Sequence, residues 1–180
     1  MKTTLLVSLL GVCIVGMGLA AEPLTPELKV KAEAALKQFS SWGTDAKVIA
    51  AVKSFNTNPS ALAKSLTQAE WDKLSILSPE IKEFTKNEVA TYLRTLKTEA
   101  VSELFVSGSN GKKVAFLSKS TSWNHTGNPK HDVPMSGKTW IGLPSTDAST
   151  GVVQLQISFP VLDGKTVIGS IVVGLQVSKL

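Results

Sequence analysis

Hydrophobic and polar positions alternate with a period of two near the end of the chain. Between residues 153 and 161 the odd positions are apolar, and the even positions hold glutamine, serine and proline. A second β-branched run follows Asp163-Gly164, and its larger apolar residues from Val167 to Val177 again share odd parity. Two such runs around an Asp-Gly turn predict a β-hairpin.

The register of this hairpin is predicted from the continuity of its apolar face. A two-residue Asp-Gly loop would mix the two parities across the strands. A three-residue loop, Leu162 to Gly164, with Gly164 at positive φ in a bulge, sets Phe159 opposite Val167 and keeps one apolar face. A buried face specifies register, which favours the bulged loop. The other face is predicted to meet solvent or something small and polar.

Helical spacing of apolar residues fills the chain before residue 100. Thr25 followed by Pro26 predicts an N-cap and a first helical position, and the helix is expected to run to Gly43. A second short helix is expected around Val48 and Val52.

Two further helix starts have clear signals. Thr67 and Glu70 form a capping-box pattern, and Leu66 and Trp71 occupy the hydrophobic-staple positions around it. Ser78-Pro79 is predicted to open one longer helix, whose apolar stripe continues to residue 96. The aromatic residues of this stripe are interpreted as core.

The period changes at residue 101. Strands are predicted at 101–107, 113–117 and 138–143, and a long polar loop joins the second to the third over residues 118–136. With the closing hairpin this makes five strands in an antiparallel sheet. Helices first and strands afterwards predict an α+β fold, with a helical part at 22–100 and a sheet part at 101–180 that form a single domain.

The first 21 residues are interpreted as a cleavable signal peptide. Lys2 precedes an apolar run that ends in small residues at Gly18-Leu19-Ala20. A transmembrane anchor is the alternative, because the run is nearly long enough to span a bilayer. Cys13, the one cysteine, lies inside this segment, so the exported protein is expected to contain no disulfide and to depend on packing for its stability.

The chain carries a formal net charge of +5, and the surplus is uneven. Five lysines and two histidines lie between Lys112 and Lys138, against one acid, Asp132. Such a surplus is usually a solvated face, but in one loop it also favours an anionic ligand. Nucleic acid is not expected as a partner, because the chain has a single arginine and is predicted to be exported.

Several segments together resemble a known family, the single Cache domain, also called the PDC sensor fold. The resemblance covers roughly residues 45–178 and depends on the order and spacing of its segments. Those segments are Ile49–Val52, Leu66–Gln68, Ser102–Val106, Val114–Ala115, Thr121–Ser122, Ser149–Gly151, Gln154–Val161 and Asp163–Gly174. The family consists of PAS-like extracytoplasmic ligand-binding domains, commonly the sensor halves of chemoreceptors and histidine kinases.

The resemblance implies a small-molecule pocket between a PAS-like sheet and the long loop. In many relatives the loop after the Thr-Ser pair carries two acids, whereas here residues 123–128 read Trp-Asn-His-Thr-Gly-Asn. With the lysine surplus, this favours a neutral or carboxylate ligand over an amine. The predicted ligand-binding residues are Thr121, Ser122, Trp123, His125, Lys138, Trp140, Gln156 and Ser158.

Simpler interpretations of these residues stay open. Trp123 and Trp140 either line the pocket or take part in ordinary packing, and Gln156 and Ser158 either line its floor or face water. His125 and His131 match no common metal signature and are interpreted as surface histidines. No metal or cofactor is expected.

No catalytic motif is present: the sequence lacks Gly-x-Ser-x-Gly, His-Glu-x-x-His and a phosphate-binding glycine loop, so the protein is not expected to be an enzyme. The predicted function is a periplasmic or secreted sensor module for a small anionic or neutral metabolite. It would signal through a partner such as a membrane receptor or a sensor kinase. The alternative is a structural or interaction protein that docks on a membrane receptor or forms a homodimer.

Overall fold

The structure is a computed structural model that describes residues 23–147 and 151–180. The predicted signal peptide lies outside the described residues. Within the part of the chain that is described, no helix is both long enough and apolar enough to cross a membrane.

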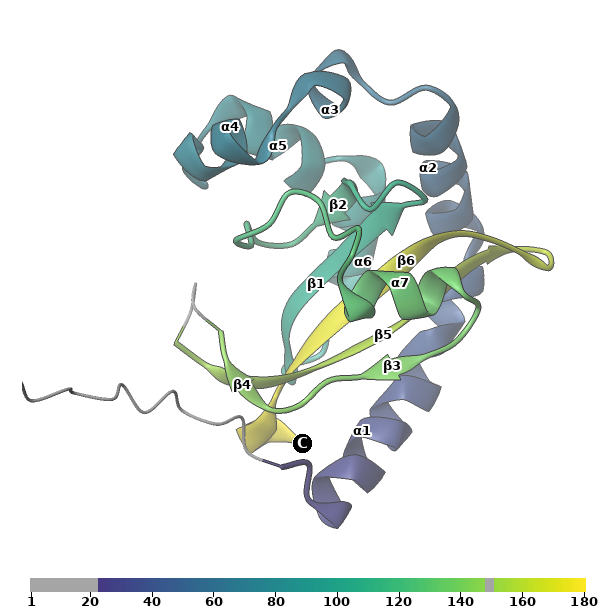
Figure 1. Ribbon diagram of the computed structural model, residues 1–180, viewed down its shortest axis with the longest axis vertical. Coiled ribbons are helices and arrows are strands. Elements are labelled where there is room, and N and C mark those ends of the chain that lie inside the picture. The colour runs from purple at the N-terminus through teal and green to yellow at the C-terminus, as the bar shows by residue number, and fades with distance from the viewer. Residues whose placement is uncertain (1–22, 148–150) are drawn as a thin grey trace, which may run out of the picture.

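A single antiparallel sheet runs through the centre of the molecule (Figure 1). Its order is β2-β1-β6-β5-β3, and the short strand β4 pairs with the other end of β5. The strands are β1 Val101–Gly108, β2 Lys113–Phe116, β3 Trp140–Ile141, β4 Ser145–Thr146, β5 Val153–Asp163 and β6 Thr166–Gln176. The α+β fold with an antiparallel sheet is confirmed, and β4 adds a two-residue strand to the five that were predicted.

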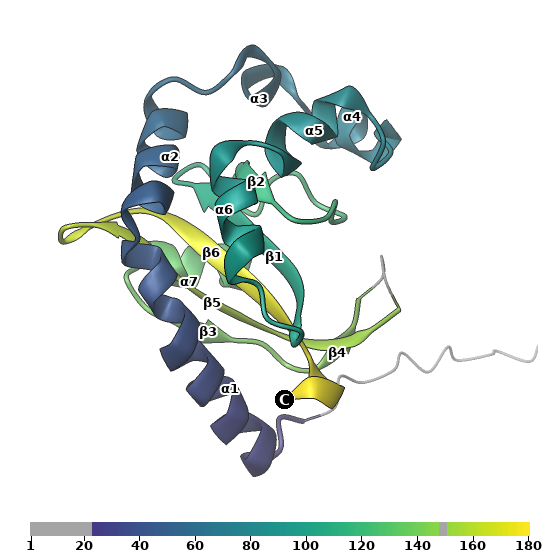
Figure 2. The same cartoon turned by 180° about the vertical axis from the view of Figure 1, so that it is seen from behind.

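Helices lie on both faces of the sheet. The segments α1, α2 and α6 cover one face, in front of the strands in Figure 2, whereas α7 lies on the opposite face, in front of them in Figure 1. The helices are α1 Pro26–Phe39, η1 Ser40–Thr44, α2 Ala46–Thr57, α3 Ala61–Ser65, α4 Gln68–Lys73, α5 Pro79–Thr85, α6 Glu88–Leu96, α7 Pro129–Met135 and η2 Val177–Lys179.

The predicted helix caps are present. The Thr25 hydroxyl accepts a hydrogen bond from the backbone N–H of Leu28 at 3.2 Å, and Pro26 occupies the first helical position. The Thr67 hydroxyl accepts from the backbone N–H of Glu70, whose carboxylate accepts in turn from the backbone N–H of Thr67. These reciprocal bonds satisfy amide donors that the first turn of a helix leaves without partners.

The longer helix predicted after Ser78 is wrong, because the structure divides it into α5 and α6. The first helix ends at Thr85 with Lys86 as its C-cap, and Asn87 caps the second. Its side-chain oxygen accepts from the N–H of Ala90, and its amide group donates to the carbonyl of Val114 on β2, both at 2.9 Å. The bond to β2 is made to a residue 27 positions away, so no local pattern signals it. The helix α3 and the helix α7, which lies inside the predicted loop, were also missed.

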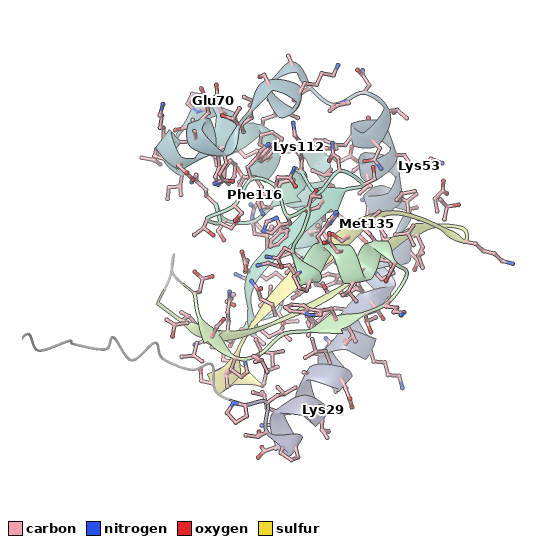
Figure 3. All side chains as sticks on the ribbon, viewed as in Figure 1. Lys29, Lys53, Glu70, Lys112, Phe116 and Met135 are labelled. Atoms are coloured by element: carbon pink, nitrogen blue, oxygen red, sulfur yellow. The ribbon has the colours of Figure 1, made fainter. Side chains whose placement is uncertain are left out.

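The odd residues of the hairpin form the core under the helices, as predicted. Leu155, Ile157, Val173 and Leu175 are fully buried, and across the sheet β1 contributes Leu104 to the same face. Side chains of α1 and α2 pack onto this layer, including the buried Val48. Lys53 on the outer side of α2, labelled in Figure 3, also pairs with Asp163 at the tip of the hairpin at 2.6 Å.

The predicted hairpin register is wrong, although its faces are right. Phe159 lies opposite Ile171 rather than Val167, and the loop is the two residues Gly164-Lys165. Gly164, with φ of 62°, has the positive φ that was predicted, here as the first residue of a two-residue turn. The bulge that restores the parity lies instead between Val161 and Leu162.

Pairing with β1 explains this register. It places Gly169 of β6 opposite Val161 and beside β1, where a Cβ atom would lie 2.3 Å from the Ser107 carbonyl oxygen. Only glycine fits so close an approach of two backbones. Because β1 lies far away in the sequence, the hairpin pattern alone did not show this contact.

Candidate functional site

The second face of the sheet is covered, not solvated. Residues 117–139, here called the covering segment, run from β2 to β3 across this face and include α7 (Figure 1). Beneath it, Gln154, Ser158 and Ser170 are no more than 3% exposed. A polar sheet face has therefore been buried under a polar loop, which is costly unless its groups find partners.

Helix α4 holds the first part of the covering segment in place. The indole N–H of Trp71 donates to the carbonyl of Ser120 at 2.9 Å. The Gln68 side chain donates to the carbonyl of Thr121 and accepts from the N–H of Trp123, also at 2.9 Å each. These bonds satisfy the backbone of an irregular segment that would otherwise be buried without partners.

The next residues dock on the β1–β2 turn and position His125. The His125 N–H donates to the carbonyl of Gly111, and the Thr126 hydroxyl donates to the carbonyl of Asn110. The imidazole consequently stacks on Phe105 of β1, with ring centroids 4.6 Å apart and planes 20° apart.

Helix α7 completes the cover. The Asn128 side chain caps the helix by accepting from the N–H of Lys130. His131 is hydrogen-bonded through Nδ1 to the Ser170 hydroxyl of β6 at 2.8 Å, which fixes the helix to the sheet. Lys130, on the same turn, donates to the side-chain oxygen of Gln156 on β5 at 3.0 Å.

A polar cavity of about 170 Å³ remains between the sheet and its cover. Acidic, basic and neutral polar groups converge on it from β1, β4, β5 and the covering segment. Its lining residues are Glu103, Ser120, Thr121, His125, Lys130, Ser145, Thr146, Asp147, Gln154 and Gln156.

A hydrogen-bond network holds the acids of this cavity. The Glu103 carboxylate accepts from the side-chain amides of Gln156 at 2.6 Å and Gln154 at 3.3 Å. Gln154 also donates to the Asp147 carboxylate at 2.8 Å. Both carboxylates are thus already bonded to amide donors, whereas Lys130 uses in this network one of the three N–H donors of an ammonium group.

Lys113 is the most buried charged side chain of the site. A register shift between Val106 and Ser107 places it opposite Ser107, and thereby on the face that the covering segment buries. Its side chain is 0% exposed, and its Nζ lies 3.5 Å from the centroid of the Phe105 ring. Burial lowers the pKa of Lys113 to about 7, with Glu103 opposing that shift and Lys130 adding to it.

Burial also lowers the pKa values of His125, His131 and Lys130. Burial is the main cause that lowers the pKa of His125 to about 2, and the positive charges of Lys113 and Lys130 lower it further. The pKa of His131 is lowered by burial, and Asp132 opposes this. The pKa of Lys130 is lowered by burial too, against the acids Glu103 and Asp147. His125 is therefore a neutral ring at physiological pH.

The prediction of surface histidines is wrong, because His125 and His131 are 4% and 2% exposed. The covering segment was predicted to be a long loop over the sheet, but without periodicity its sequence did not show which positions face inward. Among the described residues, no group of three or more histidine, cysteine, aspartate or glutamate side chains is arranged to hold a metal ion.

The structure brings together only some of the predicted ligand-binding residues. Thr121, His125 and Gln156 line the cavity. Ser158 lies on the same face, fully buried under the cover. Ser122 is half-buried, and its carbonyl accepts from the Ser120 hydroxyl, but it does not line the cavity.

The remaining predicted residues lie away from the cavity. Trp123 packs between Trp71 and Phe84, with ring centroids 5.3 and 4.9 Å apart, so it is part of the core under α4 and α5. Trp140 is half-buried on β3 and pairs with Ser158, and Lys138 is exposed.

Sequence reasoning missed several residues that line the cavity or lie beside it. Glu103 shares parity with Phe105 and Ser107 along β1, and a charged residue in line with buried positions was the available signal. Lys113 had no such signal, since its direction depends on the bulge in the β1–β2 pair. Asp147 reaches the cavity only because β4 pairs with β5.

A larger groove of about 290 Å³ lies beside α2, α5 and α6. Its ionisable lining residues are Glu83 and Glu88, and its walls include Phe55, Pro59 and Val89. The smaller cavity is the better candidate site, because convergent polar groups and shifted pKa values mark functional sites more reliably than volume.

No family model matches the sequence, and no curated protein matches it. Among solved structures, the chain is similar to the sensor domain of the V. cholerae histidine kinase DctB, with 17% identity and a TM-score of 0.48 over 83% of this chain and 52% of that one.

Two chemoreceptor domains are also similar. The ligand-binding domain of Campylobacter jejuni Tlp3 in complex with L-valine is 13% identical, with a TM-score of 0.41 over 86% of this chain and 65% of that one. The ligand-binding domain of Pseudomonas aeruginosa PAO1 PctC in complex with GABA is 14% identical, with a TM-score of 0.37 over 81% and 61%. This chain thus spans between about half and two thirds of their lengths.

Proposed function

We propose that this protein is a sensor module that binds a small carboxylate-bearing metabolite in the cavity under the covering segment. One observation carries the proposal. In the described ranges, each buried side-chain polar atom without a hydrogen-bond partner lies on this face of the sheet or in its cover. These atoms belong to Ser107, Lys113, Trp123, His125 and Ser158. Native proteins pair most such groups, so a cluster of exceptions on one face calls for an explanation.

The balance of donors and acceptors favours an anion. The acids Glu103 and Asp147 are engaged by glutamine amides, but Lys113 has no acceptor and Lys130 retains free donors. A carboxylate is acceptor-only when it is ionised, so in the cavity it could accept from the free donors of Lys130 and place a negative charge near Lys113. Each charge-assisted hydrogen bond would contribute about 1.5–3 kcal/mol to binding.

The volume of the cavity limits the size of the ligand. A cavity of about 170 Å³ corresponds to roughly six molecules of liquid water, since each occupies about 30 Å³. Acetate, propionate and L-lactate are of this size. Amino acids such as the valine and GABA in the chemoreceptor complexes are larger and would fill more of this volume.

Isothermal titration calorimetry with matched ligands tests the proposal. Acetate, propionate and L-lactate are expected to bind, whereas propionamide, an uncharged analogue of similar shape, is not. L-alanine, valine and GABA test whether a ligand ammonium can displace the glutamine amides from Glu103 and Asp147. If propionamide binds as well as propionate, the site does not recognise charge and the proposal fails.

Variants locate the site. Lys130→Gln is expected to weaken carboxylate binding by about tenfold or more, the factor that corresponds to about 1.4 kcal/mol. The matched control is Lys138→Ala, which alters an exposed lysine of the same segment that the sequence analysis placed in the site. If Lys138→Ala abolishes binding and Lys130→Gln does not, the site lies at the sequence-predicted location instead.

We further propose that the protein is exported and that it signals through a partner. The apolar run that ends at Gly18-Leu19-Ala20 supports cleavage and a periplasmic or secreted location, with a membrane receptor or sensor kinase as the partner. The intact mass of the exported protein is expected to show loss of about 20 residues, a usual signal-peptide length. Full-length protein held in the membrane fraction would contradict this. An interaction role without a ligand predicts homodimers by analytical ultracentrifugation that no carboxylate affects.

A further inference from the structure

The side chain of Lys113 lies in an environment that favours a neutral group over an ammonium. It comes from the edge strand β2, is fully buried, and its Nζ lies over the face of the Phe105 ring. Interaction with an aromatic face stabilises a cation by about 2 kcal/mol when water is excluded, less than the cost of burying the charge. Hydrogen bonds would have to supply the rest, but Nζ has no acceptor among the described residues.

The bulge in the β1–β2 pair is the reason why Lys113 is buried on this face. Phe105 pairs with Phe116 and Val106 with Ala115, but Ser107 pairs with Lys113, so Val114 is the extra residue. Directly opposite residues share a face, and Lys113 therefore lies on the same face as Phe105 and Glu103. Val114 turns instead toward the helices and lines the groove beside α2. Without the bulge, Val114 would lie opposite Ser107 and Lys113 would point to the other face.

Lys113 is close enough to the cavity to respond to a charge in it. Its Nζ contacts Phe105, which stacks on His125, a lining residue. Its charge interacts with Glu103 and Lys130, which line the cavity from the sheet and from α7. A negative charge bound beside Lys130 would therefore act on Lys113 as well.

We infer that binding of the ligand is coupled to protonation of Lys113, so that this site takes up a proton as it takes up an anion. The inference rests on the proposed function, because it needs a negatively charged ligand in the cavity. Without the ligand the buried amine is partly neutral, since Glu103 alone opposes its desolvation and Lys130 adds a repulsive charge. With the ligand, a second negative charge offsets Lys130, and the charged form of Lys113 is favoured.

The other ionisable groups around Lys113 are not expected to take up the proton in its place. His125 stays neutral in the working range, because its pKa is lowered to about 2. Lys130 faces both Glu103 and Asp147, whose charges oppose the lowering of its pKa. On α7, His131 is held by Ser170 and has Asp132 beside it.

The direction of the pH dependence follows from the protonation step. In the free protein the pKa of Lys113 is about 7, so near pH 7 the amine is about half protonated. If the bound anion raises this pKa well above 8, affinity is full below pH 7 and falls as the pH rises through it. Carboxylate affinity is then expected to be about tenfold weaker at pH 8 than at pH 6, with about half a proton taken up per ligand at pH 7.

Calorimetry across pH tests this with acetate, propionate and L-lactate as the probes, at pH 6, 7 and 8. Titrations at pH 7 in phosphate and in Tris, which differ in ionisation enthalpy, measure the protons taken up. The test variant is Lys113→Met, which keeps an unbranched side chain of nearly the same length and removes the titrating group. The matched control is Lys112→Met, since the Lys112 ammonium donates to the carbonyls of Ala63 and Lys64 on α3, away from the cavity.

The expected result is a pH-dependent affinity and proton uptake in the wild type and in Lys112→Met, and the loss of both in Lys113→Met. NMR of labelled lysine Nζ groups should also show the titration of Lys113 move to higher pH when a probe binds. Carboxylate binding that is equal at pH 6 and pH 8 would overturn this inference and leave the proposed function intact. A pH dependence that persists in Lys113→Met would overturn it too. Failure of every carboxylate to bind at any pH would overturn the proposed function and, with it, the coupling.

Discussion

Both faces of the central sheet are covered, but by opposite chemistry. On the helix face, the layer of Leu104, Ile157 and Val173 meets α1 and α2 through apolar contacts alone. On the covered face, charged and polar side chains such as Glu103 and Lys113 lie under a polar segment whose backbone is held by side chains of α4. Both faces belong to the same strands, so the difference arises from side-chain parity and from the elements that cover them.

Burial therefore has different consequences for stability on the two faces. Apolar burial contributes about 25 cal/mol for each Å² removed from water, which makes the helix face the main source of stability. Buried polar groups contribute little net stability, and unpaired ones oppose folding. The covered face is therefore better explained by ligand binding than by stability, and substitutions on the two faces should separate these roles.

The largest loss of stability is expected on the helix face. Ile157 is fully buried between Val173 and Ile141 in the sheet, so Ile157→Asn both removes packing and buries an amide. The free energy of unfolding, measured by urea titration, should fall by on the order of 3 kcal/mol or more. Ile157→Val, the matched control, should cost about 1 kcal/mol. A loss below 1 kcal/mol for Ile157→Asn would mean that this face is not the core.

A gain in stability is expected from the opposite face. Lys113→Met removes a buried ammonium and should stabilise the free protein by about 2 kcal/mol at pH 7, within the range seen when buried charges are replaced by apolar residues. The gain is moderate because Glu103 loses a neighbouring positive charge.

This gain should depend on pH in a defined direction. The pKa of Lys113 is about 7 in the folded protein and 10.5 as a free side chain. Between these values the unfolded state binds more protons, so the wild type becomes more stable as the pH rises. Urea titrations at pH 7 and pH 10 should show the advantage of Lys113→Met shrink. An advantage that does not change with pH would show that burial leaves the pKa of Lys113 at its free value, so that the amine stays charged in the folded protein.

A smaller effect is expected at Gln156. Its side chain accepts from Lys130 and donates to Glu103, and the shorter asparagine could not reach both. Gln156→Asn should cost about 1 kcal/mol, because hydrogen bonds to charged groups are involved but the residue is only half-buried. On a solvated face, one of the two outcomes predicted from the sequence, the cost would be well under 1 kcal/mol. Thermal or urea unfolding decides between the two values.

The smallest effect is expected in the exposed part of the covering segment. Lys138→Ala removes an exposed side chain and should change the free energy of unfolding by less than about 0.5 kcal/mol. Carboxylate affinity should change less than twofold in the same variant. A larger loss of affinity would bring this lysine back into the site.

Much of the candidate site could not be predicted because its residues meet through distant pairings. Thr121, His125 and Gln156 were found because they lie in the long loop or on the polar parity of the hairpin. Lys130 lay in the same loop, but the helix that directs it toward Gln156 had no periodic signal. Trp123 was taken as a ligand residue because nothing local showed that Trp71 and Phe84 would enclose it.

The sequence by itself determined the features that depend on neighbours a few residues apart. Helix caps at Thr25 and Thr67 need only donors within three positions, and the alternating hairpin needs only a period of two. The tertiary structure decided where β6 is seated on β1, where the bulges fall, that Asn87 splits a helix, and that a polar sheet face is buried. Each of these depends on contacts between segments far apart in the chain, whose geometry is settled only when the backbones approach and their hydrogen bonds must be satisfied.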